Sequence, residues 1–411
     1  MFGRPTPGRR LAAGPLRFGP LAFLLLATTA AAVISVESAP RRSPVGTGIM
    51  SPWGTTRPFS TSATTTTSTP TGSPGAQAVA WADMVNGLNL APDTVSCPSA
   101  TLCVFAGAAN QFAGQQQHAV SVSTGPFTPG RKVTGLLSYF PQPPNDDAFY
   151  GWWYVTCPST TLCVISSPQG IYATGSPLSG HWVLEVAATS MVGFGAVSCP
   201  TVSFCAVAAG NEVFISTAPL DGSSAWSPTQ VTQGTEGGVS AISCPSPRFC
   251  VAGGSAGFVG GWMEVSTDPG GGPNAWWGGP VAHPDEAQHS GEYSITDVSC
   301  PTMALCVANE LEAPLLVSTN PAAGPSTWQP VTAPNTPYSV DPPPGVVSCD
   351  PNGACLMSGV GTFSVAASTS GPVFVGYPES EVSCVTTSMC ISVDVATSDP
   401  FEVGGIRGTL Q

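Results

Sequence analysis

The chain has 411 residues, of which only 9% are charged, and it carries 11 Lys and Arg against 24 Asp and Glu. Since about a quarter of the residues of a soluble chain are normally charged, its surface must be built largely from uncharged polar residues, Gly and Pro. Residues 77–411 hold four of the basic residues and 23 of the acidic ones. This part would repel a phosphate backbone, which argues against nucleic acid as a partner.

The N-terminus has the pattern of an export signal. Four arginines between residues 4 and 17 precede an apolar run of 16 residues over 21–36, and basic residues followed by an apolar stretch are typical of a secretory signal. The run is long for a signal but short of the roughly 18–20 residues that span a bilayer. We therefore expect residues 1–39 to be either a cleaved signal peptide or a retained membrane anchor. In both cases the rest of the chain is secreted or anchored at the cell surface.

Residues 40–75 follow and are rich in Thr, Ser and Pro, including the run TSATTTTSTPTGSPG. Such a composition cannot bury enough apolar surface to offset the entropy lost on ordering. We expect a disordered linker.

From residue 95 the chain repeats one unit seven times. Each copy contains an apolar residue, Ser or Thr, a Cys, five residues, and a second Cys followed by an apolar stretch. The first cysteines of successive copies are on average about 48 residues apart, which is the period of a four-stranded propeller blade with variable loops. The pairs are Cys97/Cys103, Cys157/Cys163, Cys199/Cys205, Cys244/Cys250, Cys300/Cys306, Cys349/Cys355 and Cys384/Cys390.

Each copy predicts four strands, A to D. Strand A ends at the first Cys, and strand B starts at the second. Strand C is an apolar stretch that ends in Ser-Thr, as in 212–217 and 262–267, and strand D follows a turn and often starts with Trp, as at Trp226 and Trp276. The period-two alternation is that of a sheet. We therefore predict an all-β fold over 76–411: a seven-bladed β-propeller with four-stranded antiparallel blades.

The two ends of the array complement each other. After the last Cys pair the chain supplies strands B and C and little more, whereas a spare strand with Trp81 lies upstream of the first copy, at 76–85. We expect this N-terminal strand to complete the last blade, because closure removes the exposed edges of an open array.

The cysteine spacing favours one disulfide in each copy. Two Cys that face each other across a hairpin lie within disulfide range, and an exported chain with an even Cys count is a suitable setting. Tetrahedral zinc needs four ligands, and each copy brings two Cys and no regularly placed His. Free thiols are the remaining alternative.

The repeat resembles that of secreted bacterial β-propellers with repeated SCPS-x3-C disulfide hairpins. Its turn is similar to the Asp-box of BNR-type propellers, best kept in Ser266-Thr267-Asp268-Pro269…Trp276, with Asn320 at the Asp position of the next copy. The resemblance covers about residues 76–411 and implies the propeller fold. It implies no single function, because such propellers range from sialidases and photosystem assembly factors to uncharacterised exported proteins.

One face of such a propeller would carry the long, variable segments: 107–118, 138–151, 278–293 and 333–345. Irregular loops on a rigid scaffold often form binding sites, and flat rings suit sugar or peptide contacts. The alternative is that the loops have no role and that one of Trp152 and Trp153 fills space between blades. The candidate binding residues are Tyr139, Phe140, Asp146, Asp147, Phe149, Tyr150, Trp152, His283, Asp285, His289, Tyr293 and Tyr338.

The segment 283–292 could hold a metal through two imidazoles and a carboxylate, but a solvated acidic loop is the simpler interpretation. We predict no metal site and no cofactor.

Catalysis is the less favoured function. A sialidase-like glycoside hydrolase needs several Arg around the substrate carboxylate, and residues 76–411 contain only Arg131, Arg248 and Arg407. Arg248 falls in an A–B turn, on the face opposite the long segments, so the three cannot converge. We predict no catalytic residue and expect a monomeric, exported module that binds a protein or a glycan. The alternatives are a glycoside hydrolase and a structural cell-envelope protein.

Overall fold

In the computed structural model the chain divides into two compact units, 1–67 and 68–411, and every described residue lies in the second. The predicted signal or anchor (1–39) and linker (40–75) lie outside the described residues. Among these, no helix is long and apolar enough to span a membrane. The described residues are 81–86, 88, 90–112, 115–125, 127, 132–140, 153–188, 194–231, 238–255, 261–281, 294–310, 315–331, 347–349, 354–357, 361–364, 381–386, 389–393 and 406–409.

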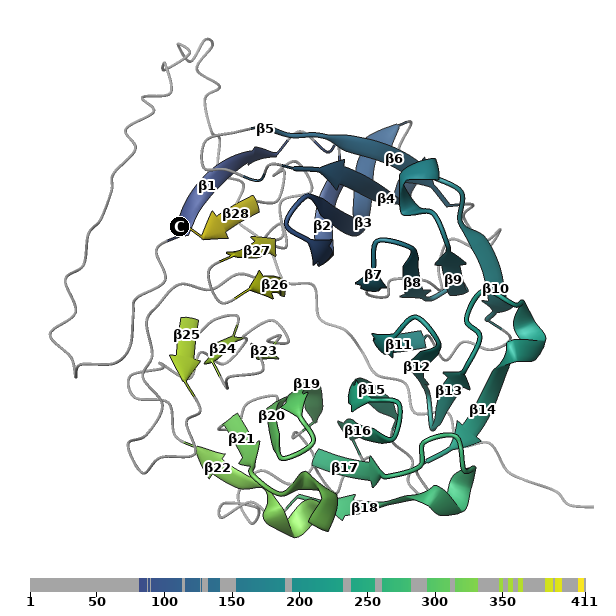
Figure 1. The fold of residues 1–411 in the computed structure, drawn as a ribbon, viewed down its shortest axis with the longest axis vertical. Helices are drawn as coiled ribbons and strands as arrows, with labels where there is room; N and C mark the ends of the chain where they lie inside the picture. Colours follow the sequence, from purple (N-terminus) through teal and green to yellow (C-terminus); the bar gives the residue numbers. More distant parts are fainter. Residues whose placement is uncertain are drawn as a thin grey trace, which may run out of the picture. The chain divides into compact units, whose positions relative to one another are not determined.

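The described part of the chain is all-β, with five four-stranded antiparallel sheets in chain order (Figure 1). Sheet 1 contains β2 (Leu90–Ser99), β3 (Leu102–Phe112), β4 (Gln115–Thr124) and β6 (Gly135–Tyr139). Sheet 2 contains β7 (Tyr154–Ser159), β8 (Leu162–Ser167), β9 (Gly170–Thr174) and β10 (Val183–Ala187). Sheet 3 contains β11 (Phe194–Thr201), β12 (Phe204–Ala209), β13 (Glu212–Ser216) and β14 (Trp226–Gln230). Sheet 4 contains β15 (Val239–Ser246), β16 (Phe249–Ser255), β17 (Gly261–Ser266) and β18 (Trp276–Pro280). Sheet 5 contains β19 (Ile295–Thr302), β20 (Leu305–Glu310), β21 (Leu315–Ser318) and β22 (Gln329–Val331).

The last two sheets depart from the predicted four strands. Sheet 6 has three strands among the described residues, and sheet 7 has five, in the order β26-β27-β28-β1-β5. The N-terminal strand β1 pairs antiparallel with β28, with Trp81 opposite Thr409, and β5 adds to β1 as an unpredicted parallel strand. Sheet 6 contains β23 (Val347–Cys349), β24 (Ala354–Met357) and β25 (Gly361–Ser364). Sheet 7 contains β26 (Glu381–Thr386), β27 (Met389–Val393), β28 (Ile406–Thr409), β1 (Trp81–Asn86) and β5 (Lys132–Val133).

The predicted disulfide hairpins are confirmed in sheets 1 to 6. In each, a disulfide joins the first two strands of the sheet, and the paired Cα atoms lie 4.0–4.1 Å apart. No described cysteine is free. Cys384 and Cys390 lie opposite each other in the β26–β27 ladder, but their side chains lie outside the described residues. The six bonds are Cys97–Cys103, Cys157–Cys163, Cys199–Cys205, Cys244–Cys250, Cys300–Cys306 and Cys349–Cys355.

Within each hairpin the second cysteine is the more deeply buried of the two. The first cysteines of sheets 1 to 5 are 4–7% exposed, whereas the second cysteines of sheets 1 to 6 are at most 1% exposed. These cysteines are therefore structural residues of the core, and they lie away from any surface that could contact a partner. The second cysteines are Cys103, Cys163, Cys205, Cys250, Cys306 and Cys355.

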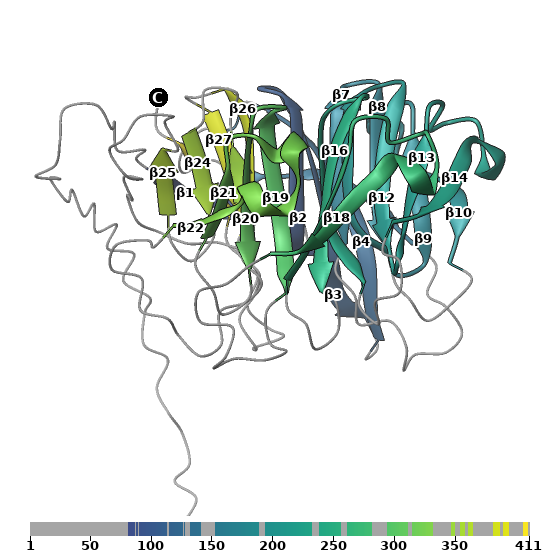
Figure 2. The same cartoon turned by 90° about the horizontal axis from the view of Figure 1, so that it is seen from below.

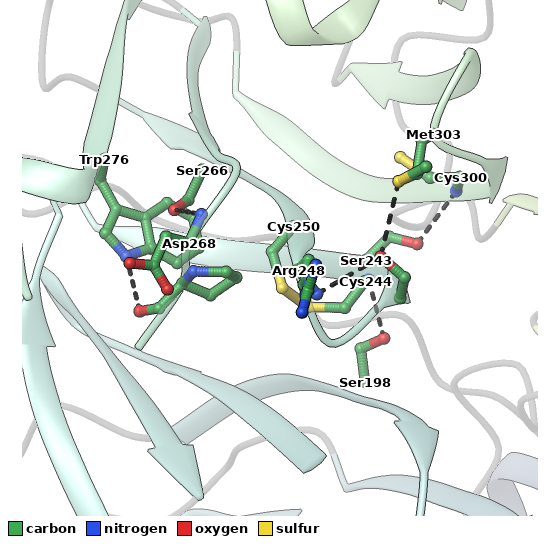
Figure 3. The surroundings of a disulfide bond; sticks show 12 residues. Ser198, Ser243, Cys244, Arg248, Cys250, Ser266, Asp268, Trp276, Cys300 and Met303 are labelled. Carbon is green, nitrogen blue, oxygen red and sulfur yellow. Dashed lines mark hydrogen bonds between the residues drawn. A yellow bond between two sulfur atoms is a disulfide. The ribbon is translucent and has the colours of Figure 1, made fainter. Parts of the chain in front are cut away.

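Hydroxyl groups join neighbouring sheets at the Ser of the Ser-Cys pairs. The Cys244 amide donates to Ser198 Oγ at 3.0 Å, and the Cys300 amide donates to Ser243 Oγ at 3.0 Å (Figure 3). The same bond recurs from Cys157 to Ser96, from Cys349 to Ser299 and from Cys97 to Ser383. The last of these joins sheet 1 to sheet 7. The first strands also contact one another from sheet to sheet, and β26 contacts β2.

The core lies between neighbouring sheets rather than at one centre. Phe204 and Ala206 of sheet 3, for example, pack with Ile242 and Ala252 of sheet 4. Sheets 1 to 5 are therefore covered on both faces, and all six residues of β8 are buried. This explains why the second strand of every copy follows its Cys with an almost unbroken apolar run.

The Ser-Thr motif at the end of the third strand forms a turn. Ser266 Oγ accepts a hydrogen bond from the Asp268 amide at 3.1 Å, and Trp276 Nε1 donates to the Pro269 carbonyl at 3.3 Å (Figure 3). Equivalent hydroxyls accept amides two residues on in sheets 2, 3 and 5, the ordinary geometry of such turns. Gly272 has φ +82°, where other residues are strained. The turns contain the short 3₁₀ helices η2 (Pro177–Ser179), η3 (Ser223–Ala225), η5 (Pro273–Ala275), η6 (Pro321–Ala323) and η7 (Pro325–Thr327).

Candidate binding face

The two ends of the strands differ. In sheets 1 to 5 a turn of two residues joins the first strand to the second, and we call this end the turn face. The opposite end, the loop face, carries the second-to-third and sheet-to-sheet connections. There the connection from β10 to β11 spans 188–193, whereas that from β18 to β19 spans 281–294. Variation in chain length is thus confined almost wholly to the loop face.

Two of the twelve predicted binding residues lie among the described residues. Tyr139, at the end of β6, is 55% exposed, whereas Phe140 is only 6% exposed. The prediction that Phe140 is a contact residue is therefore wrong, because its side chain is part of the core. The ten that lie outside the described residues are Asp146, Asp147, Phe149, Tyr150, Trp152, His283, Asp285, His289, Tyr293 and Tyr338.

Phe140 is buried because it completes an aromatic cluster between sheets 1 and 2. Its ring packs edge-on against Trp153 at 5.0 Å and against Tyr172 at 4.7 Å between centroids. Trp153, 1% exposed, also stacks on His118 at 5.1 Å with an interplanar angle of 13°. Trp153 thus fills space between two sheets, as the packing alternative predicted.

His118 lies at the base of the β3–β4 hairpin, in a segment that the sequence predicts to be a loop. Residues 107–118, predicted as an irregular loop, instead lie almost entirely in β3 and β4, whose register runs from Leu102 opposite Thr124 to Phe112 opposite Gln115. In Figure 2 these two strands reach beyond their neighbours on the loop face. Burial lowers the pKa of His118, so the ring at this base is neutral at pH 7.

The structure also contains buried carboxyl groups that the sequence analysis did not single out. Burial raises the pKa of Asp93, Asp297 and Glu264 to about 7, and that of Glu310 to about 8. The signal was present as acids inside apolar strand sequences, as in ITDVSC and WMEVST. An acid at such a position either faces solvent or is buried, and the strand pattern does not distinguish the two.

Two of these carboxyl groups accept hydrogen bonds within the fold. Asp297 Oδ2 accepts the Val347 amide of the next sheet at 2.5 Å, and Glu264 Oε1 accepts Trp262 Nε1 at 2.7 Å. Within the described ranges no group of three or more His, Cys, Asp and Glu is placed to hold a metal ion. Arg248 lies in the β15–β16 turn on the turn face, as predicted, while the side chains of Arg131 and Arg407 lie outside the described residues.

Comparison with known proteins identifies no family. No protein-family model matches the chain, and no curated protein matches it. A chain from the crystal structure of the mitotic checkpoint complex is 11% identical over 83% of this chain and 98% of its own, with a TM-score of 0.48. The computationally designed Ika8 protein is also 11% identical, over 80% of this chain and 100% of its own, with a TM-score of 0.42.

Proposed function

We propose that the protein is an exported, non-catalytic β-propeller of seven blades that binds a protein or glycan partner through its loop face. The observation that carries the proposal is the contrast between the two faces. The turn face repeats one disulfide-linked, two-residue turn in five sheets, whereas the loop face joins the same strands through connections of very different length. A rigid scaffold with variable connections at one end is a common way to build a recognition site.

Several contacts support a closed wheel of seven sheets. The first strand of each sheet contacts the first strand of the next, and β26 contacts β2. The Cys97 amide donates to Ser383 Oγ at 2.9 Å, and β1 pairs with β28. Such closure leaves only short outer edges, as in a propeller.

Export is supported by the cysteine chemistry. Six disulfides within one chain are characteristic of an oxidising compartment outside the cytoplasm. The basic and apolar N-terminus is the segment that would direct the chain there.

A glycoside hydrolase is the second candidate, and its requirements weigh against it. Acid–base hydrolysis needs two carboxyl groups about 5–10 Å apart with access to the sugar. The buried carboxyl groups of Asp297 and Glu264 are engaged with a backbone and an indole N–H group, and Arg248 lies on the face away from the variable connections.

The test replaces residues 141–152, between β6 and β7, with a Gly-Ser segment of equal length. The replacement begins after Phe140 and ends before Trp153, because both are buried. The full-length native protein and the variant are screened on a glycan array and against a displayed peptide library. We expect ligands of the native protein to lose affinity at least about tenfold in the variant, since contact residues are lost.

The control changes Val202 and Met303, which are 51% and 56% exposed at the turn face, to Ser. We expect this variant to bind as the native protein does. Equal binding by the loop variant, or release of sugar from chromogenic glycosides by the native protein, would contradict the proposal.

A further inference from the structure

We propose that the projecting end of the β3–β4 hairpin binds an extended polypeptide segment by strand addition to the edge of β4, and that this segment is rich in Lys and Arg. The inference rests on the proposed function, because it names the partner class of the loop face. It assigns the recognition to the backbone of residues 115–117.

The edge of β4 is paired over only part of its length. On one side β4 pairs with β3 from Thr124 to Gln117 and, after a register shift that places an extra residue in β3, again at Gln115 opposite Phe112. On the other side β6 pairs with β4 from Ser123 to Ala119, and the Phe140 amide donates to the His118 carbonyl at 3.2 Å. Within the described part of the chain, no strand pairs with β4 on this second side before His118.

The direction of the backbone groups that have no strand partner among the described residues follows from the bond between Phe140 and His118. In an antiparallel ladder each residue directs its N–H and C=O to the same side, and successive residues alternate. Since the carbonyl of His118 points toward β6, the N–H and C=O of Gln116 point to that side as well. One amide and one carbonyl are therefore presented in line with the end of β6, as a strand-addition site requires.

The base of the hairpin is held firmly. The ring of His118 stacks on Trp153 of the next sheet. On the other side of sheet 1, Gly107 lies so close to β2 that a Cβ would come within 2.1 Å of the Ala91 carbonyl oxygen. A pre-organised edge lowers the entropic cost of binding an extended chain.

This edge lacks the features that protect the outer strands of other sheets. Strands β14, β18 and β22 contain Pro228, Pro280 and Pro330. Proline and charge on an edge strand oppose the addition of another strand. Residues 105–119, in contrast, contain no proline and no Asp, Glu, Lys or Arg.

Charge selects the partner. Residues 77–411 carry 23 acidic residues against four basic ones, so a second copy of the chain would be repelled, while a cationic segment would be attracted. The bound peptide therefore combines a β-prone sequence of alternating residues with Lys or Arg at its ends.

The experiment selects peptides from a displayed random library on the native full-length protein, under conditions that keep the disulfides. Selected peptides are then measured against two variants. Gln116→Pro removes the backbone N–H that would donate a hydrogen bond to a carbonyl of the partner. Gln116→Thr changes the side chain and keeps the backbone N–H. We expect basic, β-prone peptides whose affinity falls at least about tenfold in the proline variant and stays within about twofold in the threonine variant.

Hydrogen exchange supplies a second measurement that does not depend on the proline variant folding. In the native protein the Gln116 amide should become protected when a selected peptide binds. Equal affinity of the proline variant with an unchanged melting temperature, or no added protection at Gln116, would overturn the hairpin assignment while leaving a loop-face binding module intact. Ligands found only on the glycan array would overturn the polypeptide partner, and no ligand of either class would contradict the proposed function itself.

Discussion

In five copies the serine hydroxyl that precedes the first cysteine forms a hydrogen bond to the neighbouring sheet. Ser243 Oγ accepts the Cys300 amide, and Ser198 Oγ accepts the Cys244 amide, each at 3.0 Å. Both amides belong to first strands, where the sheets approach one another most closely. A buried amide without an acceptor is costly, which accounts for the serine at this place in those five copies.

Replacing Ser243 with Ala tests this contact. We expect the free energy of unfolding to fall by about 1–2 kcal/mol, because the Cys300 amide loses its acceptor. Urea denaturation under non-reducing conditions provides the measurement. The matched control is Ser203→Ala, since Ser203 is exposed and its Oγ lies 3.4 Å from Thr201 Oγ1 in the same turn, and a change below about 0.5 kcal/mol is expected there. Equal effects of the two variants would show that the inter-sheet bond contributes little.

At this scale the sequence predicts the cysteine pairs but not the neighbouring contacts. Cysteine identity and a constant spacing within a hairpin are local, so bonds such as Cys244–Cys250 and Cys300–Cys306 follow from the chain alone. The acceptor of the Cys300 amide lies 57 residues away, and the burial of Asp297 depends on the next sheet. Contacts between repeats require the angle between sheets, which no strand pattern contains.

At the scale of elements, the strand predictions hold where turn chemistry and alternation agree. The third strands that end in Ser-Thr are found as β13, β17 and β21, because the hydroxyl turn fixes where each strand ends. For the segment 107–118, in contrast, the prediction of an irregular loop is wrong. Its Ala, Asn and Gln residues resemble a loop, yet pairing between β3 and β4 continues through most of them, since backbone ladders depend on the partner strand more than on side-chain propensity.

The N-terminal strand offers a test at this scale. A chain that begins at residue 76 should keep its melting temperature, whereas one that begins at residue 87 loses the ladder from Trp81 to Met84 with β28. We expect the shorter chain to be less stable by about 3 kcal/mol, seen as a drop in melting temperature of roughly 4 °C. Differential scanning calorimetry of the two proteins would show it. Identical transitions would mean that β1 adds nothing to the last sheet.

At the scale of the whole molecule, stability is distributed rather than central. Apolar clusters lie between successive sheets, and a disulfide links the first hairpin in each of six sheets. Each sheet therefore depends on its two neighbours, as in other repeat proteins. Such a body tolerates long insertions at one face, because a longer surface loop adds little entropic cost to folding.

The buried carboxyl groups make the stability of this body depend on pH. The pKa of Asp93, Asp297 and Glu264 is about 7 in the folded protein, and that of Glu310 is about 8, against about 4 in an unfolded chain. Between these values the folded state binds more protons than the unfolded state does. The free energy of unfolding therefore decreases as the pH rises from about 4 to about 8.

We accordingly expect the urea midpoint to be higher at pH 5 than at pH 8 when the disulfides are kept intact. The double variant Glu264→Gln, Asp297→Asn should flatten this dependence, because each amide oxygen can still accept the Trp262 or Val347 hydrogen bond while no proton is exchanged. Exposed Asp268, changed to Asn, serves as the control for replacing a carboxyl group with an amide. A midpoint that rises toward pH 8, or a double variant with the native slope, would contradict the burial of ionisable carboxyl groups. The expected outcome would show that these buried groups make the free energy of unfolding higher at mildly acidic pH than at pH 8.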